Sequence, residues 1–184
     1  MRIVIGITGA SGSVYAVRFV ERCPGEKYLI ASEWGERVLH EETGLRVDDL
    51  SKRVTAVYAD DDLMAPVSSG SFVYDACVII PCSVSTLGKI ATGVADTLLT
   101  RVAGVCLKER RKLVLCVREA PWSPIALEQA AKLSNLGVTI MPASPPFYTR
   151  PKTLEEAVDA FLNKVLIHLG VSVDWGWKHD PDEP

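Results

Sequence analysis

Short apolar runs recur along the chain, and a stretch with helical character follows each of them. Five runs are almost continuously apolar rather than alternating, which is typical of strands buried on both faces of a parallel sheet. These predicted strands are Ile3–Thr8, Tyr28–Ala31, Cys77–Pro81, Leu113–Val117 and Val138–Met141. A sixth segment, Arg53–Ala59, alternates with polar residues, and this pattern predicts a strand at the edge of the sheet.

The segments between the strands predict helices. They are Ser13–Arg22, Trp34–Thr43, Ser85–Ala91, Thr97–Lys108 and Pro124–Leu136. A last helix, Leu154–Leu169, follows Thr153 as its N-cap, with Glu156 placed to complete a capping box. Strands that alternate with helices imply right-handed crossovers. The sequence therefore predicts an α/β fold with a three-layer, doubly wound parallel sheet.

The overall composition excludes some classes of partner. The 184 residues suit one domain, and 48 % apolar with 23 % charged residues is typical of a globular protein. The net charge of −3 provides no general attraction to nucleic acid or to an anionic membrane, so neither is an expected partner. Binding of a phosphate group must therefore depend on individual, locally placed cations.

The five cysteines indicate a reducing compartment. Their number is odd and no C-x-x-C pair occurs, which argues against a disulfide framework and against a zinc site. The apolar opening run Met1–Thr8 is too short for the core of a signal peptide, and no run approaches the length of a membrane span. We expect a cytoplasmic location and no metal site.

The residues after each strand carry the candidate chemistry, because ligands of open parallel sheets bind beyond the carboxyl ends of the strands. The first turn, Thr8–Ser13, is made of small residues and opens a helix, which favours an anion. Ser32 and Glu33 follow the second strand. No acid stands at the end of that strand, where a dinucleotide-binding protein has one to bind the ribose, so a mononucleotide is favoured over NAD. The alternative is that this turn is merely tight.

Further polar groups follow the central strands. Ser83, Ser85 and Thr86 supply more hydroxyls than one helix cap needs, although capping by Ser83 is the simpler alternative. Arg118 and Glu119 follow the strand Leu113–Val117. Two interpretations of these residues are open: a structural ion pair, or groups that bind a ligand and move its protons.

The charged residues on the predicted helices give less evidence of function than the residues at the strand ends. Arg101 and Lys108 lie seven residues apart and share a helix face. The following Arg110, Arg111 and Lys112 are interpreted as a solvated helix end. Glu42, near the end of its helix, has no local signal beyond that of a surface residue.

Several motifs together resemble one family. They are T-G-A-S-G-S-V-Y (Thr8–Tyr15), S-S-G-S-F (Ser68–Phe72), P-C-S-V-S-T-L (Pro81–Leu87), L-K-E-R-R-K-L-V-L-C-V-R-E-A-P (Leu107–Pro121) and P-P-F-Y-T-R-P (Pro145–Pro151). In this order they resemble the UbiX flavin prenyltransferases, from Ile3 to about Gly170.

The resemblance implies a flavodoxin-like or Rossmann-like fold, with residues 1–170 as a single FMN-binding domain and residues 171–184 as a C-terminal tail. It also implies transfer of a dimethylallyl group from dimethylallyl phosphate to N5 and C6 of reduced FMN. The product, prenylated FMN, serves UbiD-type decarboxylases. Members of the family assemble as homododecamers.

The resemblance also assigns roles to individual positions. The implied FMN contacts are Gly9, Ala10, Ser11, Ser32, Ser83, Val84, Ser85, Thr86 and Arg118. The implied substrate contacts are Ser69, Gly70, Arg101, Lys108, Tyr148 and Lys164. The implied catalytic residues are Ser11, Glu42, Lys108 and Glu119. Some relatives carry arginine in place of Lys164, and a lysine there loses the bidentate fork.

Two other functions stay open on the sequence. An FMN-dependent cysteine decarboxylase of related fold needs a histidine on an early helix, and His40 is the candidate. A flavodoxin-like carrier needs FMN but not the cations Arg101, Lys108 and Lys164. In the tail, either Trp175 or Trp177 fits a tryptophan position of the family, and the tail is either an ordered arm or a frayed terminus.

Overall fold

The computed structural model describes residues 1–176 and divides into two compact units, Met1–Ala143 and Ser144–Pro184, which are described separately. Trp177 and the rest of the tail lie outside the described residues. None of the helices in residues 1–176 is both long and apolar enough to cross a bilayer.

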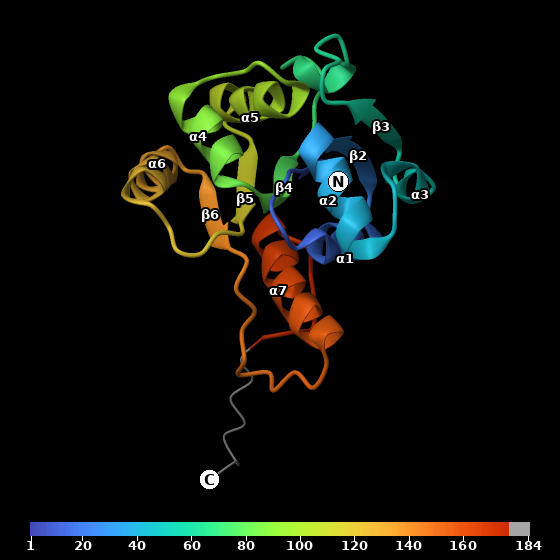
Figure 1. The fold of residues 1–184 in the computed structure, drawn as a ribbon. Helices are drawn as coiled ribbons and strands as arrows, with labels where there is room; N and C mark the ends of the chain where they lie inside the picture. The colour runs from blue at the N-terminus through green and yellow to red at the C-terminus, as the bar shows by residue number, and fades with distance from the viewer. Residues whose placement is uncertain (177–184) are drawn as a thin grey trace. The chain divides into compact units, whose positions relative to one another are not determined.

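A six-stranded parallel sheet forms the centre of the first unit, in the order β3-β2-β1-β4-β5-β6 (Figure 1). The strands are β1 (Arg2–Ile7), β2 (Glu26–Ala31), β3 (Ala56–Ala59), β4 (Ala76–Cys82), β5 (Lys112–Val117) and β6 (Thr139–Pro142). The chain proceeds outward from β1 in one direction and from β4 in the other. This doubly wound order places the switch point, where nucleotides bind, between β1 and β4.

Helices cover both faces of this sheet. They are α1 (Ser13–Arg22), α2 (Glu33–Thr43), α3 (Val47–Ser51), α4 (Val84–Thr92), α5 (Leu98–Glu109) and α6 (Pro124–Asn135). α1 packs against α2, while α4 packs against α5 and α6 to form the opposite layer (Figure 1). The predicted fold class, a three-layer doubly wound parallel sheet, is confirmed.

Burial along the strands follows their place in the sheet. Every residue of β4 is buried, because helices lie over both of its faces. β3 alternates between half-buried and exposed positions, which confirms the predicted edge strand. It begins at Ala56 rather than at Arg53, because Arg53 N–H donates to the Leu50 carbonyl and closes the turn after α3.

The second unit contains α7 (Leu154–Leu169), whose bounds are those predicted. Thr153 caps the helix as expected, and its Oγ1 accepts from Glu156 N–H at 3.1 Å. The Glu156 carboxylate accepts from the Lys152 N–H at 2.6 Å, one residue before the position predicted for a capping box. The rings of Tyr148 and Trp175 lie 5.9 Å apart, so Trp175 packs within this unit.

All five cysteines are buried free thiols. Burial raises the pKa of Cys23 to about 11 and that of Cys82 to about 12. Cys77 and Cys82 lie on β4, Cys106 lies on α5 and Cys116 lies on β5. The sulfurs are therefore distributed over the core of the first unit.

Candidate active site

The turn between β1 and α1 holds an anion from the chain itself. Gly12, at φ 108°, is the N-cap of α1 and has no side chain with which to cap it. Glu42, near the end of α2, fills this role. Its carboxylate accepts from the Gly12 N–H at 3.1 and 2.9 Å and from the Ser13 N–H at 2.7 Å. The anion that the sequence predicts at this helix start is therefore the carboxylate of Glu42, from the chain itself.

The donors around Glu42 also determine its charge. Burial raises the pKa of Glu42, but the Ser11 hydroxyl and the N–H groups of Ser13 and Gly12 outweigh that effect and hold the pKa below its usual value. A carboxylate with several N–H donors stays ionised, because the donors stabilise the charged form. Glu42 therefore acts here as a fixed negative charge.

Arg118 joins the end of β5 to the first turn. Its Nε donates to the Ser11 carbonyl at 3.1 Å, and its backbone N–H donates to the Cys82 carbonyl at 3.1 Å. Glu119 follows, and its carboxylate accepts from the Ala120 N–H at 3.0 Å. Arg118 thus brings the ends of β1, β4 and β5 together at one edge of the sheet, as expected, and Glu119 directly follows it.

Thr8 makes a second link between strand ends, one that the sequence analysis did not single out. Its buried Oγ1 donates to the Pro81 carbonyl at 2.8 Å and accepts from the Ser83 N–H at 2.8 Å. One hydroxyl therefore fixes the end of β1 against the end of β4 at the switch point. A hydroxyl that directly follows an apolar strand is the only signal the sequence offers for this role.

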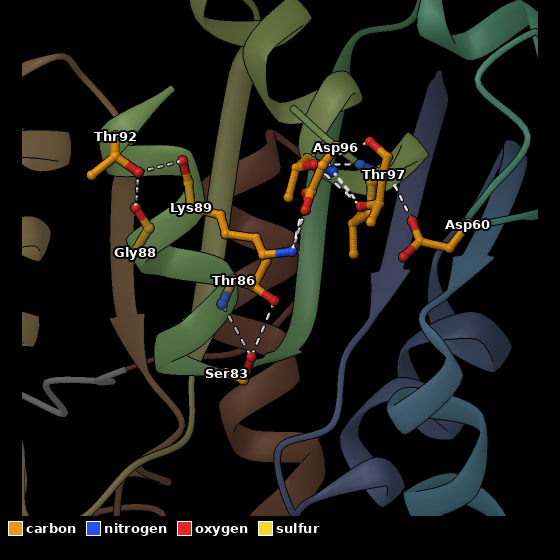
Figure 2. A network of polar contacts seen from close by, with 10 residues as sticks. Asp60, Ser83, Thr86, Gly88, Lys89, Thr92, Asp96 and Thr97 are labelled. Atoms are coloured by element: carbon orange, nitrogen blue, oxygen red, sulfur yellow. Dashed lines mark hydrogen bonds and ion pairs between the residues drawn. The ribbon is translucent and has the colours of Figure 1, made fainter. Parts of the chain in front are cut away.

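A cavity of about 250 Å³ opens above these strand ends. Seven hydroxyl residues line it: Thr8, Ser32, Ser83, Ser85, Thr86, Thr97 and Thr100. Its other lining residues are Gly9, Trp34, Asp60, Lys89 and Leu99. The helix starts of α2, α4 and α5 contribute to the wall, and Figure 2 shows part of it. Of the expected FMN contacts, Ala10 is buried in the first turn and Val84 begins α4.

Three of the cavity hydroxyls cap helices, and one of them is Thr97 at the start of α5. Ser32 Oγ accepts from the Gly35 N–H at 3.1 Å, and Ser83 Oγ accepts from the Thr86 N–H at 3.2 Å. The capping alternative for Ser83 therefore holds, and the same hydroxyl also lies 3.1 Å from Thr86 Oγ1. Capping and ligand binding are compatible, since both face the positive end of a helix.

The loop with Ser69 and Gly70 lies against α5. Arg101 Nε donates to the Ser68 carbonyl at 3.2 Å, and Lys108 pairs with Glu109. A Cβ at position 70 would collide with the Glu109 carboxylate and lie 2.7 Å from Lys108 Nζ, so a larger residue there would have to displace these two side chains. The structure therefore brings together Ser69, Gly70, Arg101 and Lys108, as expected.

The interpretation of Arg111 as part of a solvated helix end is wrong. Its guanidinium donates to the Phe72 carbonyl at 3.0 Å and to the Gly70 carbonyl. It also stacks over the Tyr74 ring, with the guanidinium carbon 4.4 Å from the ring centroid. Arg111 therefore fastens this loop. The two other expected substrate contacts, Tyr148 and the exposed Lys164, belong to the second unit.

A second, larger cavity of about 400 Å³ lies between α2, α3 and β3. Its charged lining residues are Glu36, Arg37, His40, Arg46 and Asp48. Acids and bases nearly balance there. None of the expected site residues lines this cavity.

Comparison with known proteins identifies the family. The Flavoprotein family model matches residues 1–164. A flavin prenyltransferase UbiX from Thermoplasma acidophilum is 47 % identical over 175 residues, covering 95 % of this chain and 97 % of that protein. This chain belongs to the UbiX flavin prenyltransferase family. The resemblance drawn from the sequence motifs is therefore confirmed.

Solved structures of UbiX-type proteins share the whole fold. AnUbiX in complex with FMN and dimethylallyl pyrophosphate has a TM-score of 0.90 at 34 % identity, covering 96 % of this chain and 98 % of that chain. A dodecameric FMN-dependent UbiX-like decarboxylase from Escherichia coli O157:H7 has a TM-score of 0.93 at 37 % identity, covering 97 % and 100 %. The prediction of an FMN-dependent prenyltransferase is thus confirmed at the level of the UbiX family.

Proposed function

We propose that this protein transfers a dimethylallyl group from dimethylallyl phosphate to N5 and C6 of reduced FMN. The observation that carries the proposal is the junction of strand ends at the switch point, where Thr8 and Arg118 fix the turns beneath a hydroxyl-lined cavity. Residues 1–170 are proposed to act as one FMN-binding domain, which agrees with the span of the family model.

FMN fits the chemistry of the cavity. Hydroxyls and helix starts suit a phosphate and a ribityl chain, because they donate hydrogen bonds to anionic and polyol oxygens. The proposed contacts are Gly9, Ala10, Ser11, Ser32, Ser83, Val84, Ser85, Thr86 and Arg118. Reduced FMN, when bound, supplies the nucleophilic nitrogen and carbon of the reaction.

The donor phosphate is assigned to the cations. Arg101 and Lys108 lie beside the loop with Ser69 and Gly70, and Tyr148 and Lys164 complete the proposed set. Fixed cations stabilise the charge that develops on a departing phosphate. By analogy with oxyanion donors, removal of one such group should lower kcat by about 10²–10³. Glycine at position 70 leaves room for this contact next to Lys108.

The proposed catalytic residues Glu42, Glu119 and Ser11 have different tasks. Glu42, which its N–H donors keep ionised, holds the turn that carries Ser11 in place. Glu119 is the proposed proton carrier for the positions that become alkylated. Ser11, whose carbonyl is fixed by Arg118, presents an exposed side chain at the start of α1.

The direct test is anaerobic incubation with reduced FMN and dimethylallyl monophosphate, and in parallel the diphosphate, followed by mass spectrometry of the flavin. A flavin mass increased by the dimethylallyl group supports the proposal, and an unmodified flavin with both donors contradicts it. Glu119→Gln should retain FMN and lose turnover. Glu128→Gln, an exposed change on α6, is the matched control and should keep turnover.

The two alternatives have weaker support. His40, which a cysteine decarboxylase would need, is exposed and lines the cavity at α3 and β3 instead of the hydroxyl-lined one. A pure carrier would tolerate loss of Arg101 and Lys108. If alanine at both positions left dimethylallyl transfer unchanged, the role assigned to these cations would be wrong.

The cellular setting is also a proposal. Five free thiols without a disulfide fit a reducing compartment, so we place the protein in the cytoplasm. A UbiD-type decarboxylase is the proposed recipient of prenylated FMN. The proposed assembly is a homo-oligomer, as in the dodecameric relative.

A further inference from the structure

The two charged residues that line the hydroxyl-lined cavity differ in how easily they can move to bind a ligand. Among the described residues that line it, only Asp60 and Lys89 are charged. Asp60 Oδ1 accepts from the Leu99 N–H at 2.8 Å, which holds its carboxylate at the start of α5. Lys89 is therefore the one cation among these residues, in a wall that already contains a carboxylate.

Lys89 is held by an acid that does not line the cavity. Its Nζ lies 3.0 and 2.8 Å from the two carboxylate oxygens of Asp96 (Figure 2). The side chains are 42 % and 52 % exposed. Exposed ion pairs of this kind hold their partners weakly, because water screens the charges and long side chains lose entropy in one geometry. Lys89 can therefore exchange this partner at little cost.

The position of Lys89 on α4 allows that exchange. It lies four residues after Ser85 and three after Thr86, so all three share one face of the helix. Side chains of a helix lean toward its N-terminus. Changes of rotamer alone can therefore carry the ammonium group toward the hydroxyls that open α4.

The neighbouring helix start is not available to a second anion. The N–H groups of Gly12 and Ser13 at the start of α1 already donate to the Glu42 carboxylate. An anion of the cofactor is thereby directed to the part of the cavity formed by α2 and α4, where Ser32, Ser83 and Ser85 lie. Lys89 is the cation that lines the same cavity.

We propose that Lys89 binds the phosphate of FMN and gives up Asp96 to do so. Asp96 is then a competing internal anion that weakens nucleotide binding. The inference rests on the proposed function, since it requires FMN in this cavity. It adds one residue that binds the cofactor and one that opposes binding.

The test compares FMN with riboflavin, which lacks the phosphate, by fluorescence titration of four proteins. They are the unmodified chain, Lys89→Met, Asp96→Asn and the double variant. Lys89→Met should raise the Kd of FMN about tenfold and leave that of riboflavin unchanged. Asp96→Asn should lower the Kd of FMN about two- to fivefold, because it frees the lysine. In the Lys89→Met background, Asp96→Asn should have no further effect.

A matched control is Lys132→Met, since Lys132 lies in the last turn of α6 as Lys89 lies in the last turn of α4. This control should leave both affinities unchanged. Lys89→Arg should retain FMN, because the charge remains. Thermal unfolding without ligand checks that each variant folds.

The opposite signs expected for the two partners separate binding from structure. If Lys89→Met and Asp96→Asn weaken FMN equally, or if riboflavin is affected as strongly as FMN, the ion pair is structural and the inference is wrong. If the unmodified chain binds FMN and Lys89→Met binds it equally well, only this inference fails. If the unmodified chain binds no FMN, the proposed function fails as well.

Discussion

Thr8 shows how a single side chain sets the geometry at the switch point. Replacement by valine keeps the volume but takes the hydroxyl away from the Ser83 N–H, and it leaves the buried Pro81 carbonyl with only the longer bond from the backbone N–H of residue 8 at 3.3 Å. We expect Thr8→Val to lower the free energy of unfolding by about 1–3 kcal/mol, since buried polar groups would lose their hydrogen bonds. Urea unfolding measures the change. Thr8→Ser keeps the hydroxyl, and an equal loss in that variant would show that the methyl group, not the hydrogen bond, matters.

The contribution of Glu42 to the stability of the first turn depends on pH. Because the donors hold its folded-state pKa below the unfolded value, the unfolded chain binds more protons between the two values. Its stabilisation is complete above the unfolded pKa, roughly 4.3, and is lost as the pH falls through the folded pKa.

Glu42→Gln should therefore lower the free energy of unfolding at pH 7 by about 1–2 kcal/mol. It should also flatten the loss of stability below roughly pH 4, measured by urea unfolding across pH. The same pH slope in both proteins would contradict the role given to the carboxylate. Glu41→Gln, at the exposed neighbouring position, is the control.

These contacts explain why only part of the candidate site could be predicted from the sequence. Glu42 reaches Gly12 across 30 positions, so no local pattern could distinguish it from a surface glutamate. The resemblance to the UbiX family was the only signal for it. Ser83 was predictable as a cap because its position before a helix is itself a local signal.

At the scale of elements, the junction between the Ser68–Phe72 loop and α5 depends on Arg111. Arg111→Met should free the Gly70 and Phe72 carbonyls and lower the free energy of unfolding by about 1–2 kcal/mol. Amide hydrogen exchange should accelerate in residues 68–72 and remain unchanged in β1. Arg111→Lys keeps the charge but loses the fork, so it should rescue only part of the effect. Uniform acceleration over the whole unit would contradict a local role.

Most elements were predictable because their burial is continuous. The apolar runs of β1, β4 and β5 are covered on both faces and so keep one clear pattern. The five-residue helix α3 was not predicted, since a helix of little more than one turn shows no period. The 3₁₀ turn at Pro66–Ser68 was missed for the same reason.

At the scale of the whole molecule, the proposed assembly predicts a mass. Light scattering after size exclusion should give about twelve times the 20.0 kDa of the chain if it assembles as its dodecameric relative does. A monomer at micromolar concentration would contradict this prediction. Composition and hydrophobic pattern could not supply the number of subunits, because apolar surface alone does not specify symmetry.

The buried thiols give the molecule a set of native reporters. A thiol reagent must wait until the surrounding structure opens, so its reaction rate at each sulfur measures the frequency of local opening. Cys82 is the informative position, since it lies next to Ser83 and its thiol donates to the Ser83 carbonyl at 3.5 Å. Occupancy of the neighbouring cavity should slow labelling at Cys82 and leave Cys23 as an internal reference. Ligand binding can thus be followed without introducing a reporter residue into the chain.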